Sequence, residues 1–145
     1  MDIRPMKSPF KELIFKEGSI LELPYATGSV ASLSCLHVIE HIGLGRYGDP
    51  IDPEGHIKAA RELCRVLKPG GKLLIGTPVG QQSLFFDAHR VFFVETIVMI
   101  FNALELKRFD FISDSGDRIV ENPAYSFSNG NKYGCGLFLF EKLSK

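Results

Sequence analysis

The residues best placed for chemistry are two histidines and a glutamate in the stretch HVIEH, residues 37–41. If that stretch were helical, His37, Glu40 and His41 would share one face, because residues three and four apart are neighbours on a helix. Imidazole nitrogens bind divalent metals, and a nearby carboxylate or imidazole can accept a proton. We therefore take His37, Glu40 and His41 as candidate catalytic residues, with a metal centre as one form of that catalysis.

The spacing resembles the HxxEH motif of one class of zinc peptidases, in which two histidines hold the metal and the glutamate activates a water. A peptidase would need a third protein ligand, for which Glu95, Glu105 and Glu121 are available. However, the next fourteen residues, IGLGRYGDPIDPEG, contain four glycines and two prolines and predict a loop. A peptidase is therefore kept only as an alternative.

The elements that must position these residues follow from hydrophobic periodicity. Apolar runs predict strands, and apolar residues at helical spacing predict a helix that Asp52 caps and Pro53 begins. The turn LKPGG ends that helix and leads into the next strand. This alternation predicts a parallel sheet and the α/β fold class, with VASLSCL buried on both faces. Strands are expected at residues 12–17, 30–36, 72–78, 105–113 and 136–142, a second helix at 94–104, and loops at DSGD and SFSNGNKYG.

Composition restricts the class of protein. The chain has 145 residues, a length typical of one domain, and its 17 basic and 17 acidic residues give a formal net charge of zero. A neutral chain is not expected to bind nucleic acid or anionic membranes in general. Three widely spaced cysteines suggest neither a disulfide framework nor a cysteine zinc site, and no apolar run is long enough to span a membrane. We expect a cytoplasmic protein.

The order of motifs resembles class I S-adenosylmethionine-dependent methyltransferases. The matching residues are Leu23, Pro24 and Tyr25 in a turn, Glu40 and His41 after a strand, and RVLKPGG at 65–71 before the next strand. The stretch HVIEHIGLGRYGDPID, with AHRVF downstream, is similar to a methyltransferase-like family of unknown function. The resemblance implies a Rossmann-like methyltransferase sheet that is N-terminally truncated, lacking the first strand, the first helix and most of the second strand. Residues 1–145 would be a single methyltransferase-like domain, its C-terminal two thirds.

The resemblance also implies a cofactor, S-adenosylmethionine, and residues that would bind it. By position, Asp2 would bind the ribose, Ser19 stands where the family often has an aspartate near the adenine, and Leu23, Pro24 and His37 would line the site. The glycine-rich turn that carries the cofactor in this family is absent from the sequence. The alternative, which we favour at this position, is that Asp2 is a frayed terminus without a role.

Small-RNA 2′-O-methyltransferases are similar in one further respect, an ExxEH sequence and a later histidine that hold a divalent metal. By position this implies a metal set of His37, Glu40, His41 and His89, which would suit Zn, Mn, Fe or Ni better than Mg. The alternative is that His37 and His41 are hydrogen-bonded to backbone at the end of a strand.

Two functions follow from the resemblance. One is methyl transfer to an oxygen or nitrogen nucleophile of a small molecule or an RNA, with His37 or His41 as the base. The other is a cofactor-less methyltransferase-like module with an interaction or structural role. A truncated sheet would expose the edge of residues 30–36, so we expect a homodimer or a partner chain to cover that edge.

Overall fold

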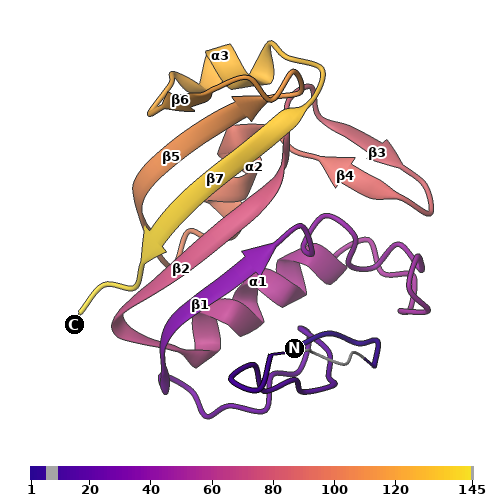
Figure 1. The fold of residues 1–145 in the computed structure, drawn as a ribbon, viewed down its shortest axis with the longest axis vertical. Coiled ribbons are helices and arrows are strands. Elements are labelled where there is room, and N and C mark those ends of the chain that lie inside the picture. The colour runs from indigo at the N-terminus through magenta and orange to yellow at the C-terminus, as the bar shows by residue number, and fades with distance from the viewer. Residues whose placement is uncertain (6–9, 145) are drawn as a thin grey trace.

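The computed structural model describes residues 1–5 and 10–144 (Figure 1). Within them, the chain forms a five-stranded sheet in the order β1-β2-β7-β5-β6 and a separate hairpin of β3 and β4. The strands are β1 (Val30–Leu36), β2 (Leu67–Val79), β3 (Ser83–Phe85), β4 (His89–Val91), β5 (Glu105–Ser113), β6 (Ile119–Glu121) and β7 (Gly134–Glu141). The helices are α1 (Gly55–Val66), α2 (Val94–Ile100) and α3 (Tyr125–Asn129).

The sheet is mixed, which confirms the α/β class and corrects the prediction of a parallel sheet. β1 and β2 are parallel, whereas β7 runs antiparallel to both β2 and β5. Parallel neighbours need a crossover connection, and α1 supplies it between β1 and β2. The chain from β5 to β7 instead turns back through β6 and the short α3, so β7 enters the sheet in the opposite direction.

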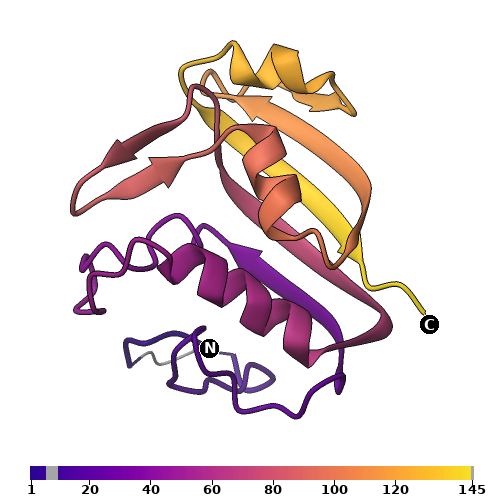
Figure 2. The same ribbon diagram turned by 180° about the vertical axis from the view of Figure 1, so that it is seen from behind.

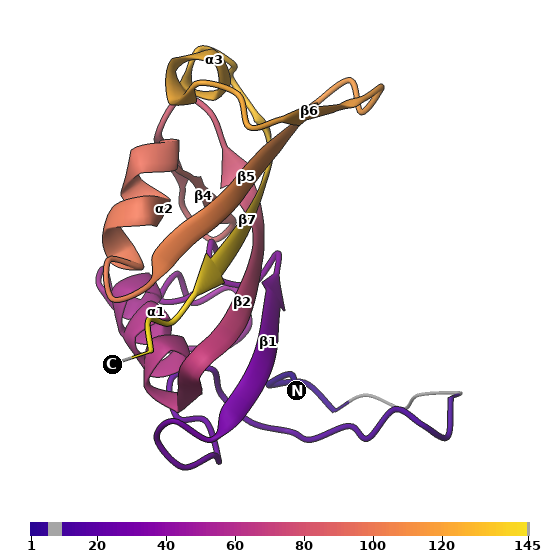
Figure 3. The ribbon, with the colours of Figure 1, turned by 90° about the vertical axis from the view of Figure 1, so that its left-hand side faces the viewer.

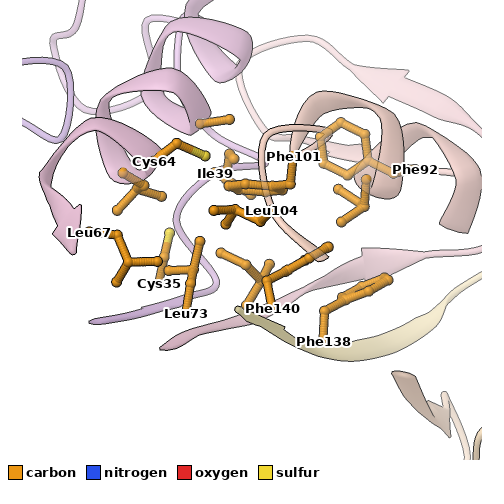
Figure 4. Close-up of a cluster of buried hydrophobic side chains, with 14 of the residues drawn as sticks. Cys35, Ile39, Cys64, Leu67, Leu73, Phe92, Phe101, Leu104, Phe138 and Phe140 are labelled. Atoms are coloured by element: carbon orange, nitrogen blue, oxygen red, sulfur yellow. The ribbon is translucent and has the colours of Figure 1, made fainter. Parts of the chain in front are cut away.

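The described helices lie on one face of the sheet (Figures 2 and 3). The core fills the space between that face and the helices (Figure 4). Its labelled members are Cys35, Ile39, Cys64, Leu67, Leu73, Phe92, Phe101, Leu104, Phe138 and Phe140, all buried. On the other face Leu36 and Leu74 are exposed. β1 is consequently not buried on both faces as predicted, since Cys35 is its one buried residue.

Several elements match their predicted positions. β5 occupies the predicted residues 105–113, β2 and β7 contain most of the predicted strands, and α1 buries Ala60 and Cys64 as its spacing indicated. The helix begins later than predicted, because the Asp52 carboxylate accepts the N–H of Glu54, and Glu54 precedes the first helical residue, Gly55. No described helix has the length and apolarity that a membrane crossing requires.

Other predictions were wrong. Residues 12–17 form no strand and take part only in an isolated bridge between Asp2 and Glu17. The helix predicted to reach residue 104 ends at Ile100. The segment SFSNGNKYG, expected to be a loop, contains most of α3, and the short strands β3, β4 and β6 were not predicted. Short elements of three to five residues carry too little periodicity to be recognised.

Candidate functional site at the carboxyl ends of β1 and β2

His37 is the first residue after β1, and the backbone turns sharply there. Its N–H still donates to the carbonyl of Gly76 on β2 at 2.8 Å, as the parallel ladder requires. Its φ of 52° is left-handed, a conformation that costs energy for any residue with a Cβ atom. The side chain of His37 is about half exposed.

The residues after His37 form turns and not a helix. His41 donates its N–H to the carbonyl of Val38, and Leu44 donates to that of His41, both across three residues. Gly43 has a φ of 78°, and a Cβ atom there would collide with the Asp52 carbonyl. The long helix that a zinc peptidase needs is therefore not formed. The structure contradicts the peptidase alternative, because that alternative requires His37 and His41 to lie on one helix.

Glu40 is the buried centre of the site, with 1% of its surface exposed. One carboxylate oxygen, Oε1, accepts a hydrogen bond from His37 Nδ1 at 3.1 Å, and Oε2 accepts one from the Thr77 hydroxyl at 3.3 Å. The carbonyl of Glu40 accepts the N–H of Arg90 at 3.0 Å. A buried carboxylate needs such partners, and here they come from the end of β1 and from β2, while β4 bonds the backbone of Glu40.

His41 is held by the turn between β3 and β4. Its Nδ1 lies 2.6 Å from the carbonyl of Ala88, which can only accept, so Nδ1 carries the proton. Its Nε2 lies 3.8 Å from Glu40 Oε1. The His41 ring meets Tyr47 and His89 edge to face, at centroid distances of 5.5 and 6.4 Å. The prediction that a histidine would bond to backbone is confirmed for His41.

The predicted metal set of His37, Glu40, His41 and His89 is not assembled. Among the described residues, no group of three or more His, Cys, Asp or Glu side chains is arranged to hold a metal ion. His37 and His41 each have Nδ1 in a hydrogen bond within the protein, and His89 packs against Phe85 with ring centroids 5.0 Å apart.

Cys135, at the start of β7, belongs to the site although the sequence did not indicate it. Its Sγ lies 3.6 Å from His37 Nε2. Burial first, and then the charge of Glu40, raises the pKa of the Cys135 thiol, and the same two causes raise the pKa of Tyr133. The only local signal was the sequence GCG before an apolar strand, which does not reveal that β7 lies beside β2.

A cavity of about 590 Å³ opens beside the free edge of β1, between that strand and the N-terminal segment. We call it the edge cavity. Three predicted cofactor residues, Asp2, Leu23 and His37, line it, and so does His41. Ser19 and Pro24 are not among its lining residues, and the Ser19 hydroxyl accepts the N–H of Leu21 at 3.1 Å in a local turn.

Asp2 is not a frayed terminus. Its N–H donates to the carbonyl of Lys16 at 3.3 Å, and its own carbonyl accepts the N–H of Gly18 at 3.1 Å. Arg4 Nε and NH2 each lie 3.0 Å from its carboxylate oxygens. Hydrogen bonds from Arg4 lower the pKa of Asp2 to about 2, so an ionised carboxylate stands at the edge cavity.

The backbone of the turn at Leu23 is hydrogen-bonded to an ion pair on α1, formed by Glu62 and Arg65. Glu62 Oε1 accepts the Leu23 N–H at 2.7 Å, and Arg65 NH2 donates to the same oxygen at 2.7 Å and to the Leu23 carbonyl at 3.1 Å. Arg65 NH1 also donates to the Tyr25 carbonyl. Arg65 is therefore a structural residue that fixes the wall of the edge cavity.

The sequence of residues 14–122 matches the family described as "Caenorhabditis protein of unknown function, DUF268". No curated protein sequence matches the chain. The similar solved structures include several methyltransferases. A methyltransferase from Thermotoga maritima, described as a possible histamine N-methyltransferase, is 17% identical, with a TM-score of 0.59 over 88% of this chain and 63% of that one.

Two further structures show the same likeness. A methyltransferase from Methanosarcina mazei is 15% identical, with a TM-score of 0.61 over 90% of this chain and 68% of that one. The 4+2 cyclase SpnF is 15% identical, with a TM-score of 0.63 over 90% of this chain and 56% of that one. At these identities the likeness shows the fold alone, a Rossmann-like methyltransferase sheet, and the chain spans little more than half to two thirds of these proteins.

Proposed function

Because the chain belongs to the DUF268 family and has a methyltransferase-like fold, we propose that it is an S-adenosylmethionine-dependent methyltransferase, or part of one. The methyl acceptor would be an oxygen or nitrogen nucleophile. The fold does not by itself settle the reaction, since a cyclase shares it. The proposal therefore depends on the site.

The edge cavity is the observation that carries the proposal. In open α/β sheets, ligands bind beyond the carboxyl ends of the strands. His37 follows β1 directly at such an end, and His41 lies in the turns after it. A volume of about 590 Å³ falls within the range of small-molecule and cofactor sites.

The residues present fit the adenosyl part of the cofactor. Leu23, Leu33 and Leu63 supply apolar walls of the cavity, which suit a flat base. The ionised Asp2 carboxylate can accept hydrogen bonds from two ribose hydroxyls, provided that one oxygen is released from Arg4. The cofactor, when bound, would supply an electrophilic methyl group.

His41 is the better placed proton acceptor for such a reaction. Its Nδ1–H is held by the Ala88 carbonyl, so its Nε2 has the lone pair. This Nε2 lies 3.8 Å from Glu40 Oε1, so the carboxylate would stabilise a proton accepted there. His41 lines the edge cavity, so an acceptor bound beside the cofactor can reach it.

A cofactor-less interaction module is the second candidate, and one observation favours it. Asp2, the acid proposed for the ribose, is already paired with Arg4 through both carboxylate oxygens. A ligand would have to compete with that pair.

Calorimetric titration with S-adenosylhomocysteine tests the proposal. We expect micromolar binding, and we expect Asp2→Asn to weaken it roughly tenfold, the effect of about 1.4 kcal/mol. Asp114→Asn, in the loop after β5, is the matched control and should leave affinity unchanged. A folded protein that does not bind would contradict the proposal and favour the cofactor-less module.

A further inference from the structure

Three side chains form a hydrogen-bonded row, and the methyl-transfer proposal uses only one of them, Glu40. Cys135 Sγ lies 3.6 Å from His37 Nε2, and His37 Nδ1 lies 3.1 Å from Glu40 Oε1. We propose that Cys135 is a nucleophilic thiol, with His37 as its base and Glu40 as a positioning residue, and that it reacts with alkyl groups carried on a good leaving group. This proposal does not depend on a cofactor in the edge cavity.

The hydrogen-bond pattern fixes the direction of proton transfer. The Glu40 carboxylate can only accept, so His37 Nδ1 carries the hydrogen of that bond. In the neutral ring the other nitrogen, Nε2, then has its lone pair, and it faces the Cys135 thiol. A nucleophile, a base that contacts it and a group that orients the base are the arrangement by which proteins activate weak nucleophiles.

Glu40 is held firmly enough to orient His37. It is buried, and the Thr77 hydroxyl donates to its Oε2 at 3.3 Å. His37 itself is fixed by its backbone bond to Gly76, in a left-handed conformation that the surrounding structure must maintain. Strained backbone of this kind is concentrated at functional sites.

The strand places the Cys135 side chain on the face of the sheet without helices. A Cβ atom at Gly134 would collide with the Phe111 ring, and one at Gly136 would lie 2.7 Å from Phe138, so aromatic rings occupy the helix side at both neighbours. Because successive residues of a strand face opposite sides, Cys135 points away from those rings. It is half-buried, whereas Cys35 and Cys64 are buried in the core.

The proposed step is a displacement at saturated carbon. Burial raises the pKa of the Cys135 thiol, so the group is protonated at neutral pH and requires a base. As the sulfur attacks the carbon, a sulfur–carbon bond forms and the bond to the leaving group breaks, with its electron pair leaving on a thioether or a halide. The thiol proton moves to His37 Nε2 and then to water. Such a displacement develops no oxyanion, so this row of groups is sufficient for it.

Alkylation of the folded protein by iodoacetamide tests the proposal, with the rate at each cysteine followed by peptide mass spectrometry. Cys135 should react, while Cys35 and Cys64 stay unmodified and so report that the fold is intact. His37→Asn, which suits a left-handed backbone, should slow alkylation of Cys135 by about a hundredfold at neutral pH. His89→Asn is the matched control and should react like the native protein.

Two further variants separate a chemical role from a structural one. In His37→Gly, where glycine accepts the positive φ, added imidazole should restore alkylation of Cys135. Glu40→Gln should slow the reaction, yet the double variant with His37→Asn should be no slower than His37→Asn alone, because Glu40 acts through His37. Unchanged or faster alkylation in both His37 variants, or no rescue by imidazole, would overturn the proposal.

Discussion

At the scale of single residues, burial changes the pKa of a histidine that lies outside the candidate site. His56, in the first turn of α1, is half-buried, with its ring 5.8 Å from that of Phe92. Burial first, and then the positive charge of Arg90, lowers the pKa of His56 from 6.5 to about 4. His56 is therefore neutral in the folded protein at neutral pH.

This shift predicts how stability depends on pH. Between about pH 6.5 and about pH 4 the unfolded chain binds a proton at His56 that the folded chain does not. The contribution of His56 to the free energy of unfolding should therefore be fully present above about pH 6.5 and should be lost as the pH is lowered toward 4. Allowing for the exposed part of the ring, the loss from this residue should be about 1–2 kcal/mol.

Urea unfolding at pH 7 and pH 4.5 measures this effect. His56→Asn removes the titrating group, so its stability should change less between the two pH values than that of the native protein. An equal change in both proteins would show that other groups cause the pH dependence.

At the scale of elements, β7 is the strand on which the site depends, because it brings Cys135 beside β2. Its glycines let the aromatic core approach the backbone. A Cβ atom at Gly134 would collide with the ring of Phe111, which is fully buried, and would lie 2.8 Å from the backbone carbonyl of Ile112. Gly130, after α3, has an ordinary φ of −70°, and a Cβ atom there would meet nothing closer than the Ser126 carbonyl at 3.3 Å.

We therefore expect Gly134→Ala to lower the free energy of unfolding by about 1–3 kcal/mol, the usual effect of overpacking a core. Gly130→Ala, the control, should change it by less than about 0.5 kcal/mol. Chemical denaturation of the two variants measures the difference. Equal stabilities would mean that Phe111 does not pack against β7 as described.

At the scale of the whole molecule, one edge of β1 is not paired with any other described strand. Among the described strands β1 pairs only with β2, and three of its residues, Ser32, Ser34 and Leu36, are exposed. An exposed strand edge offers backbone hydrogen-bonding groups to another chain. We propose that a second copy, or a partner chain, covers this edge.

Sedimentation velocity over a wide range of protein concentration tests self-association. The native chain should sediment faster as its concentration rises, and Ser34→Lys, which places a charge on the edge strand, should remain monomeric. Thr27→Lys, in the exposed turn before β1, is a control for the added charge. A native chain that is monomeric at every concentration would leave only a different partner for this edge.

The sequence by itself determined the features that depend on neighbours along the chain. The apolar spacing of residues 55–66 and the alternation of residues 105–113 indicated α1 and β5, and the glycines after His41 indicated a loop in place of a long helix. HVIEH was correctly expected at the end of a strand. These features are local, because helical and strand periodicity and turn formation are properties of short segments.

Only the tertiary structure decided which distant residues meet. His37 and Cys135 are 98 positions apart and come together because β7 enters the sheet antiparallel beside β2. The tertiary structure also leaves β1 at the edge of the described sheet, where four of its seven residues are exposed and only Cys35 is buried. Strand order and direction result from long-range packing and from the length of the connections, which no short segment of sequence encodes.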